Sequence, residues 1–162
     1  MLLDIRKLFS SYNAPIKQNV VIDLQDEGFP GFWVKKPVST ELYLMLSGSA
    51  MQLIVSADAV VEAECARCLD KVERVFAVKR EYTIKEEDSL SDDAELPFTP
   101  DGKLDVKELI YQEILLLVPT VLLCSDECQG LCPVCGKKKA EGCTCAVDTT
   151  DDRLSILKQL LS

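Results

Sequence analysis

Apolar and polar residues alternate along four stretches of the chain, at residues 16–25, 37–48, 51–65 and 71–85, after a shorter amphipathic stretch at 2–9. A period of two places successive side chains on opposite faces, so each of the four predicts a strand with one buried face. In the fourth, one face carries Val72, Phe76, Val78, Tyr82 and Ile84 and the other carries Lys71, Glu73, Lys79 and Glu81. We predict an antiparallel β-meander with one face in solvent.

A helical period follows the predicted strands. Asp105 is suited to cap the start of a helix, and Pro119 ends the run. Between them, apolar residues recur at helical spacing at Val106, Leu109, Ile110, Ile114, Leu117 and Val118. We expect this helix to pack across the sheet. A last, short helix is predicted from Asp151 or Asp152 to Leu161.

These elements predict an α+β fold in two parts. Residues 1–119 form the antiparallel sheet and its helix, residues 120–162 form a cysteine-rich tail ending in a short helix, and we expect one integrated domain. The chain has 162 residues, of which 48% are hydrophobic, so it can bury a core. No stretch reaches the roughly 18 apolar residues of a membrane span, and charges interrupt the N-terminal run that a signal peptide needs. We expect a cytoplasmic protein with no membrane partner and reduced thiols.

Eight cysteines occur in four close pairs: Cys65/Cys68, Cys124/Cys128, Cys132/Cys135 and Cys143/Cys145. Such spacing lets both sulfurs of a pair converge on one metal ion, whereas disulfides more often join distant positions. The chain has no histidine, so a site built from these ligands is all-thiolate. Four thiolates suit zinc and also an iron–sulfur cluster. We predict that all eight cysteines bind zinc and that the C-terminal tail is a zinc-binding element.

The clearest motif is the Cys-Pro-Val-Cys-Gly turn at residues 132–136. In such a turn, amide groups point at the first sulfur and the glycine permits a positive φ. Cys143 and Cys145 follow shortly afterwards and can complete a four-cysteine site around one ion. This grouping predicts a small metal-bound loop in the tail.

The remaining two pairs are far apart in the sequence. Cys65 and Cys68 lie at the turn between the third and fourth strands, while Cys124 and Cys128 follow the helix. A shared ion would pin the helix exit to the sheet edge and couple metal binding to folding. Two alternatives stay open. Either the two middle pairs (124/128 and 132/135) share one ion and the outer pairs the other, or a single zinc leaves four cysteines reduced and buried.

Several classes of enzyme are excluded by missing motifs. The sequence has no phosphate-binding glycine loop, nucleophile elbow or paired-carboxylate signature, and no histidine to serve as general base. Zinc held by four thiolates offers no open position to a substrate. We therefore predict that the protein is not an enzyme and has no small-molecule substrate.

Thiol chemistry is the alternative. Cys65 and Cys68 have the spacing of a redox dithiol, with Arg67 available to lower a thiol pKa. Such motifs usually open a helix after a strand, whereas this pair lies between two predicted strands. A redox-regulated protein that releases zinc on oxidation is a further alternative.

The charge of the chain bears on its partners. The formal net charge is −9, and eight thiolates holding two Zn²⁺ ions would make it −13. An acidic protein repels nucleic acid and attracts basic proteins. Against this background, Lys137, Lys138 and Lys139 form a basic run. They either offset the negative charge of the adjacent thiolate site or contact RNA phosphates without reading sequence, in a patch that Arg67, Lys71 and Arg74 would extend.

Four features of the second half of the chain occur together. They are the turn Cys65-Ala66-Arg67-Cys68-Leu69, the helix end Leu115-Leu116-Leu117-Val118-Pro119, the segment Cys128-Gln129-Gly130-Leu131-Cys132-Pro133-Val134-Cys135-Gly136, and the closing Asp152-Arg153-Leu154. In this order the set resembles the YceD family, the large ribosomal RNA subunit accumulation proteins, over about residues 60–162.

The resemblance implies a noncatalytic bacterial or organellar protein that supports large-subunit ribosomal RNA accumulation and ribosome biogenesis. Its partners would be a ribosomal protein, pre-ribosomal RNA of the large subunit, or both. The family's cysteines carry over as Cys65, Cys68, Cys128, Cys132 and Cys135, with Cys143 and Cys145 closing the tail. The chain departs from the family pattern at residues 151–153, where Asp-Asp-Arg stands in place of Asp-Pro-Arg.

Overall fold

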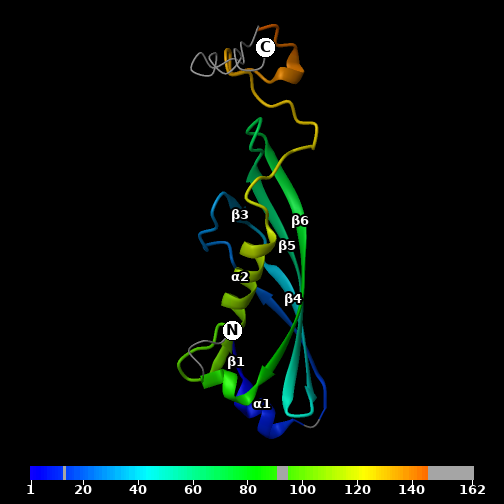
Figure 1. The fold of residues 1–162 in the computed structure, drawn as a ribbon, viewed down its shortest axis with the longest axis vertical. Helices are drawn as coiled ribbons and strands as arrows, with labels where there is room; N and C mark the ends of the chain where they lie inside the picture. The colour runs from blue at the N-terminus through cyan, green and yellow to red at the C-terminus, as the bar shows by residue number, and fades with distance from the viewer. Residues whose placement is uncertain (13, 91–94, 146–162) are drawn as a thin grey trace, which may run out of the picture.

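Antiparallel pairing joins the four strands that the sequence predicts. The computed structural model describes residues 1–12, 14–90 and 95–145. In it, β2 (Ile16–Ile22) pairs with β4 (Val38–Ser47), β4 with β5 (Ala50–Glu64), and β5 with β6 (Lys71–Lys85). A fifth strand, β3 (Phe32–Val34), pairs with the last part of β5. The predicted meander and the α+β class are confirmed (Figure 1).

The alternation in the sequence becomes the alternation of burial. Along β5, every second side chain from Met51 to Ala63 is buried. On β6, Val72, Val78 and Ile84 are buried on the same side of the sheet, as predicted. β5 and β6 pair over their whole length, from Ala50 opposite Lys85 to Glu64 opposite Lys71. This long hairpin carries the turn 65–70 at its end, well beyond the shorter strands (Figure 1).

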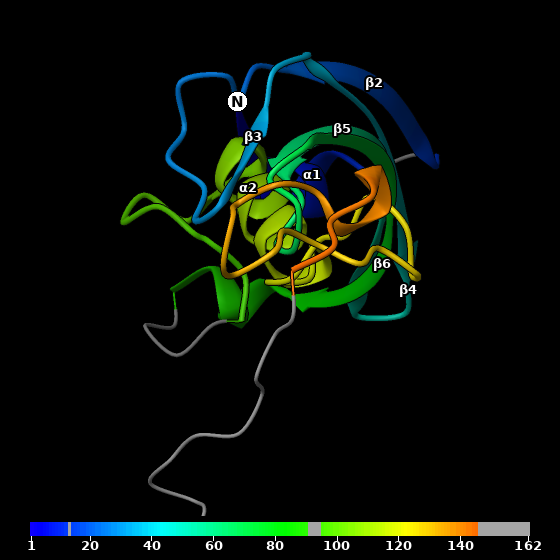
Figure 2. The same cartoon turned by 90° about the horizontal axis from the view of Figure 1, so that it is seen from above.

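The helix α2 (Val106–Leu117) lies on the concave side of the curved sheet. It begins where predicted, because the Asp105 carboxylate accepts hydrogen bonds from the N–H groups of Lys107 and Glu108 at 3.0 and 3.5 Å. Seen along the long axis, the sheet curves around it (Figure 2). The apolar side chains of Ile110 and Ile114 are fully buried against the sheet.

A buried carboxylate ties α2 to β6. Glu113 accepts hydrogen bonds from Arg80 Nε at 2.7 Å and from Tyr82 Oη at 2.5 Å. Burial and these contacts with Glu113 raise the pKa of Tyr82, so its phenol remains a donor throughout the physiological range. The hydrogen bonds fix the rotation of α2 about its axis relative to β6.

Short elements complete the base of the molecule. The stretch at residues 2–9 forms β1 (Leu2–Asp4) and α1 (Ile5–Ser11), and β1 pairs with β7 (Lys103–Asp105). The acidic segment after β6 starts with a 3-10 turn, η1 (Glu86–Leu90). The predicted last helix lies outside the described residues. No helix in the described part of the chain has the length and apolar character that crossing a membrane requires.

Candidate metal centres

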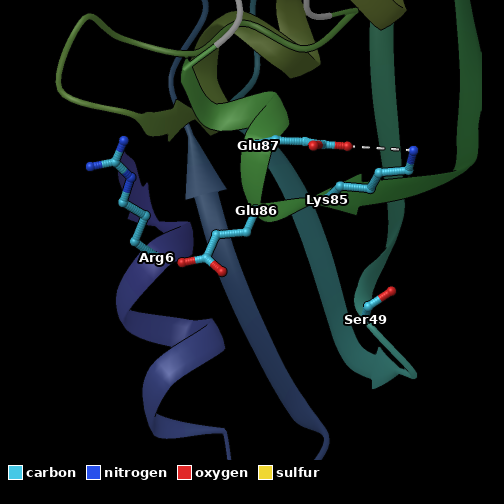
Figure 3. Close-up of a pocket in the computed structure, with 5 residues that line it drawn as sticks. All are labelled: Arg6, Ser49, Lys85, Glu86 and Glu87. Atoms are coloured by element: carbon cyan, nitrogen blue, oxygen red, sulfur yellow. Dashed lines mark ion pairs between the residues drawn. The ribbon is translucent and has the colours of Figure 1, made fainter.

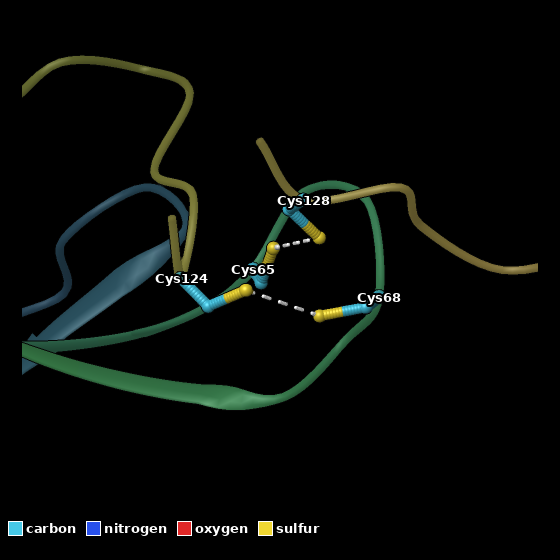
Figure 4. Close-up of side chains that lie close together, drawn as sticks. All are labelled: Cys65, Cys68, Cys124 and Cys128. Carbon is cyan, nitrogen blue, oxygen red and sulfur yellow. Dashed lines mark hydrogen bonds between the residues drawn. The ribbon is translucent and has the colours of Figure 1, made fainter. Parts of the chain in front are cut away.

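Four cysteines meet at the end of the β5–β6 hairpin (Figure 4). Cys65 and Cys68 belong to the turn between the two strands, whereas Cys124 and Cys128 belong to the segment after α2. All four sulfurs lie within 4.8 Å of one another. The Sγ atoms of Cys65 and Cys128 are 3.8 Å apart, and those of Cys68 and Cys124 are 3.6 Å apart. We call these four residues the hairpin cluster.

Four more cysteines meet in the tail. Cys132 and Cys135 come from the Cys-Pro-Val-Cys-Gly turn, and Cys143 and Cys145 follow the short 3-10 turn η2 (Lys139–Glu141). These sulfurs also lie within 4.8 Å of one another, with 3.6 Å between Cys135 and Cys143. We call this set the tail cluster. Among the described residues, these two sets are the groups formed, so the alternative that joins the two middle pairs is not the arrangement seen.

The sulfur spacing suits a metal ion. Zinc bonded to four sulfurs at about 2.3 Å in a tetrahedron places those sulfurs about 3.8 Å apart. The observed separations of 3.6–3.8 Å match this value. A disulfide requires about 2.05 Å between its sulfurs, and all eight cysteines are free thiols. Each cluster could therefore hold one metal ion.

The clusters differ in exposure. In the hairpin cluster, Cys65 and Cys68 are buried, packed with Val72 and Leu123 in a small apolar cluster of their own. Cys124 is exposed and Cys128 is intermediate. In the tail cluster, only Cys132 is buried, Cys135 is exposed and the other two are intermediate. An ion in the tail cluster would therefore be the more accessible to chelators and oxidants.

The two Cys-x-x-Cys turns share one backbone pattern. In each, the first cysteine donates its N–H to the carbonyl five residues later, and its own carbonyl accepts the N–H from four residues later. These bonds measure 2.7–2.9 Å: Cys65 to Asp70 and Leu69 to Cys65 in the hairpin cluster, Cys132 to Lys137 and Gly136 to Cys132 in the tail cluster. The predicted metal-binding turn at residues 132–136 thus occurs twice.

Backbone amides favour the thiolate form of the first cysteine in each turn. Burial alone would raise the pKa of Cys65, but the N–H groups of Arg67, Cys124 and Cys68 outweigh it and lower this pKa to about 6. The N–H groups of Cys135 and Val134 likewise lower the pKa of Cys132 to about 6. These amides stabilise the ligand form that a metal needs.

The pKa of a neighbouring thiol shifts in the opposite direction. Cys143 and Cys135, by hydrogen bonding to the side chain of Cys145, raise its pKa to about 12. A second thiolate beside the first is disfavoured by like-charge repulsion unless a cation is present. The tail cluster therefore has the electrostatic character of an incomplete site that a divalent cation would complete.

Leu69 stands where the second turn has glycine. Its φ is +63°, against +70° for Gly136, and it is the one described non-glycine residue with positive φ. A side chain in the left-handed region costs on the order of 1 kcal/mol. Leu69 is 60% exposed, so its packing offsets little of this cost.

Replacing Leu69 with glycine should therefore stabilise the metal-loaded protein by about 0.5–1 kcal/mol, since relief of strain exceeds the entropy cost of glycine. Urea unfolding in the presence of zinc measures this. Leu69→Ala is the control, because it removes the same exposed side chain but keeps the strained φ. Equal stability of the two variants would show that the conformation of residue 69 carries no cost.

The tail is fastened to the hairpin turn. The carbonyl of Arg67 accepts the N–H of Leu131 at 3.0 Å, and the Arg67 guanidinium donates to the carbonyl of Cys128 at 2.8 Å. Asp70 and Lys138 form an ion pair at 2.7 Å. The Lys138 hydrogen bond lowers the pKa of Asp70, and Asp70 raises that of Lys138. The tail cluster is therefore held against the turn that carries the hairpin cluster.

The three lysines of the basic run differ in their contacts. Lys138 is engaged by Asp70, while Lys137 and Lys139 are exposed. The guanidinium groups of Arg67 and Arg74 donate to backbone carbonyls of the segment 123–128. Three of the six predicted cations thus position backbone or pair with a carboxylate. The sequence reasoning missed Asp70, since nothing in the sequence links it to Lys138, which lies 68 residues away.

A hollow lies at the opposite end of the sheet (Figure 3). It measures about 640 Å³ and is lined by Arg6, Ser49, Lys85, Glu86 and Glu87. Lys85 and Glu87 form an exposed ion pair at 3.6 Å. Ligand sites are usually enclosed and mostly apolar with a few polar groups, which this open, charged hollow is not.

Comparison of the chain with known protein families agrees with the resemblance that the four sequence features indicate. The profile of the family described as large ribosomal RNA subunit accumulation protein YceD matches residues 53–161. This span begins within β5 and includes both cysteine clusters. No curated protein and no solved structure matched the chain. Because the match covers more than half of the chain, the chain belongs to the YceD family of large ribosomal RNA subunit accumulation proteins.

Proposed function

We propose that this protein is a noncatalytic cytoplasmic factor that supports accumulation of the large-subunit ribosomal RNA, and that two structural zinc–thiolate sites hold its recognition surface. One observation carries the proposal: both four-sulfur clusters lie inside the segment that matches the YceD family. The part of the chain that defines the family is therefore also the part that metal would organise.

The donor set favours a structural zinc ion at each cluster. Four thiolates complete the tetrahedral coordination of zinc and leave no position for substrate or water. In a multinuclear iron–sulfur cluster, different cysteines bind different irons, which suits sulfurs farther apart than the 4.8 Å limit found here. Dithiol catalysis through Cys65 is disfavoured, because its side chain is fully buried.

A basic ribosomal protein is the first contact that the charge favours. The net charge is −9, or −13 with two zinc–tetrathiolate sites, and an acidic surface steers basic partners and repels RNA at long range. Of the predicted basic run, Lys137 and Lys139 are exposed and make no ion pair with the described residues. RNA contact would therefore be local to these two side chains.

The test is the ratio of large-subunit to small-subunit ribosomal RNA in cells whose only copy of the gene encodes a variant. We expect Cys132→Ser to lower this ratio, because it removes a buried ligand of the tail cluster. The control is Ser125→Ala, an exposed change that leaves all eight sulfurs in place. An unchanged ratio in Cys132→Ser and in the gene deletion would overturn the proposal.

The same cells identify the partner class. Crosslinking followed by isolation of the protein should recover a basic ribosomal protein, and the double variant Lys137→Gln and Lys139→Gln should leave this capture unchanged. Capture of ribosomal RNA that is lost in the double variant would instead show that RNA is the first contact.

A further inference from the structure

The strand β6 forms an open edge of the sheet. It is 15 residues long and pairs with β5 on one side. On its other side it pairs with no strand of the described part of the chain. Figure 1 shows β6 along one margin of the molecule in its upper half, below the cysteine turn, and crossing towards the middle of the base in its lower half. A long edge strand with unpaired N–H and C=O groups is a template for pairing with another strand.

The backbone groups that face this edge can be identified. At the end of the hairpin, the Cys65 N–H donates to the Asp70 carbonyl. Hydrogen-bonded pairs alternate along an antiparallel ladder, so even-numbered residues of β6 direct their N–H and C=O groups towards β5 and odd-numbered residues direct theirs outwards. The N–H of Lys85 agrees, because it donates to the Asp88 carboxylate instead of β5. Residues 73 to 83 offer a run of outward groups that no described residue bonds.

The side chains of the same odd-numbered residues lie on the outer face of the sheet, where charged residues flank an apolar centre. Val75, which is 66% exposed, and Ala77 are apolar and occupy the middle. Glu73 lies before them and Lys79 after them, with opposite charges. The next outward residues carry the opposite charges: Lys71, before Glu73, is positive, and Glu81, after Lys79, is negative.

This pattern is complementary to itself. We propose that the free edge of β6 pairs antiparallel with β6 of a second copy of this chain, about a two-fold axis at Phe76. In that register Val75 lies opposite Ala77 of the second copy, Glu73 opposite Lys79, and Lys71 opposite Glu81. The two-fold axis doubles each contact, so four ion pairs flank an apolar centre and every hydrogen-bonded pair uses outward backbone groups.

Neighbouring registers are less favourable. Moving the axis to Ala77 places Glu73 opposite Glu81, and moving it to Val75 places Lys71 opposite Lys79. Like charges directly opposite each other destabilise a strand pair. The charge pattern therefore selects the register about Phe76. Glu73 has one competing contact, an exposed ion pair of 3.5 Å with Lys36, of the kind that contributes little.

An exposed leucine flanks the same edge. Glu113 on α2 bonds to Arg80 of β6, so this flank of the helix faces β6. Leu116 follows three residues later on the same flank and is 74% exposed. The opposite flank carries Tyr111, which bonds to the carbonyl of Gly28. Pairing of two β6 edges is expected to cover Leu116 as well as Val75.

Sedimentation equilibrium of the zinc-loaded full chain tests this pairing. We expect a monomer–dimer equilibrium for the unaltered protein. Lys79→Glu and Glu73→Lys should each raise the dimer dissociation constant about tenfold or more, because each sets like charges opposite each other at two symmetric positions. The double variant exchanges the signs and should restore the dissociation constant to within about threefold of the unaltered value.

The control is Lys17→Glu on β2, at the other edge of the sheet, which changes the net charge by the same amount as Lys79→Glu. It should leave the dissociation constant unchanged. A monomer at every concentration would overturn the proposal, as would a double variant as weak as the single ones. Binding of another protein to β6 in place of the second copy would overturn it too.

Discussion

Replacing Cys128 with serine should remove the metal ion from the hairpin cluster and lower the free energy of unfolding by about 4 kcal/mol or more. The loss is large because one ion joins two segments that are distant in sequence. Cys65 and Cys68 close the β5–β6 hairpin, while Cys124 and Cys128 hold the segment leaving α2. In the variant three sulfurs remain in the crowded site, and no cation offsets the negative charge of their thiolate forms.

Amide hydrogen exchange locates the effect. The N–H of Ala66 bonds to the Leu122 carbonyl, and the N–H of Leu131 bonds to the Arg67 carbonyl. Both bonds cross between the segments that the ion joins, so both amides should lose protection in Cys128→Ser. The amides in the middle of β5 should keep theirs. Protection at Ala66 and Leu131 equal to that of the unaltered protein would show that the ion does not fasten the tail.

Replacing Gly130 with alanine should have the second-largest effect, because this glycine touches the hairpin turn. Its φ is +73°, and a Cβ at this position would lie 2.9 Å from the carbonyl oxygen of Arg67. That oxygen belongs to the backbone of the turn and already accepts the Leu131 N–H, so it cannot move without breaking the contact. We expect a loss of about 2–4 kcal/mol, the sum of the left-handed strain and the overlap.

Gly142 provides the matched control for this substitution. Its φ is +84°, and a Cβ there would meet no atom within 4 Å. Gly142→Ala should therefore lower the free energy of unfolding only by the cost of the left-handed backbone conformation, about 1 kcal/mol. Urea unfolding of the two variants with saturating zinc measures the difference. Equal losses would mean that the tail does not pack against the turn at Arg67.

The sheet and α2 could be predicted because their periodic patterns are long. β5 and β6 carry 15 residues each, so alternation extends over enough positions to exclude a helix. β1, β3 and β7 have three residues each, too few to show a period. β3 also depends on a partner that is distant in sequence: Trp33 lies opposite Glu62.

In the candidate metal sites too, the local features could be predicted, whereas the contacts between segments distant in sequence could not. The spacing of each cysteine pair is local and identifies it as a metal-binding turn. The assignment of Cys65/Cys68 to Cys124/Cys128 depends on the path of the chain after α2, which the spacing leaves open. Leu69 hid the likeness of the two turns, because glycine marks the positive φ in one of them and leucine adopts it in the other.

Metal content per chain tests the central claim most directly. The protein is purified without chelator, its metals are measured by elemental analysis, and its reactive thiols are counted in the same sample. The two clusters predict two zinc ions per chain and no readily reactive thiol. One zinc with four reactive thiols would confine the metal to one cluster and favour redox chemistry at the other. Metal-free protein with disulfides would contradict the account.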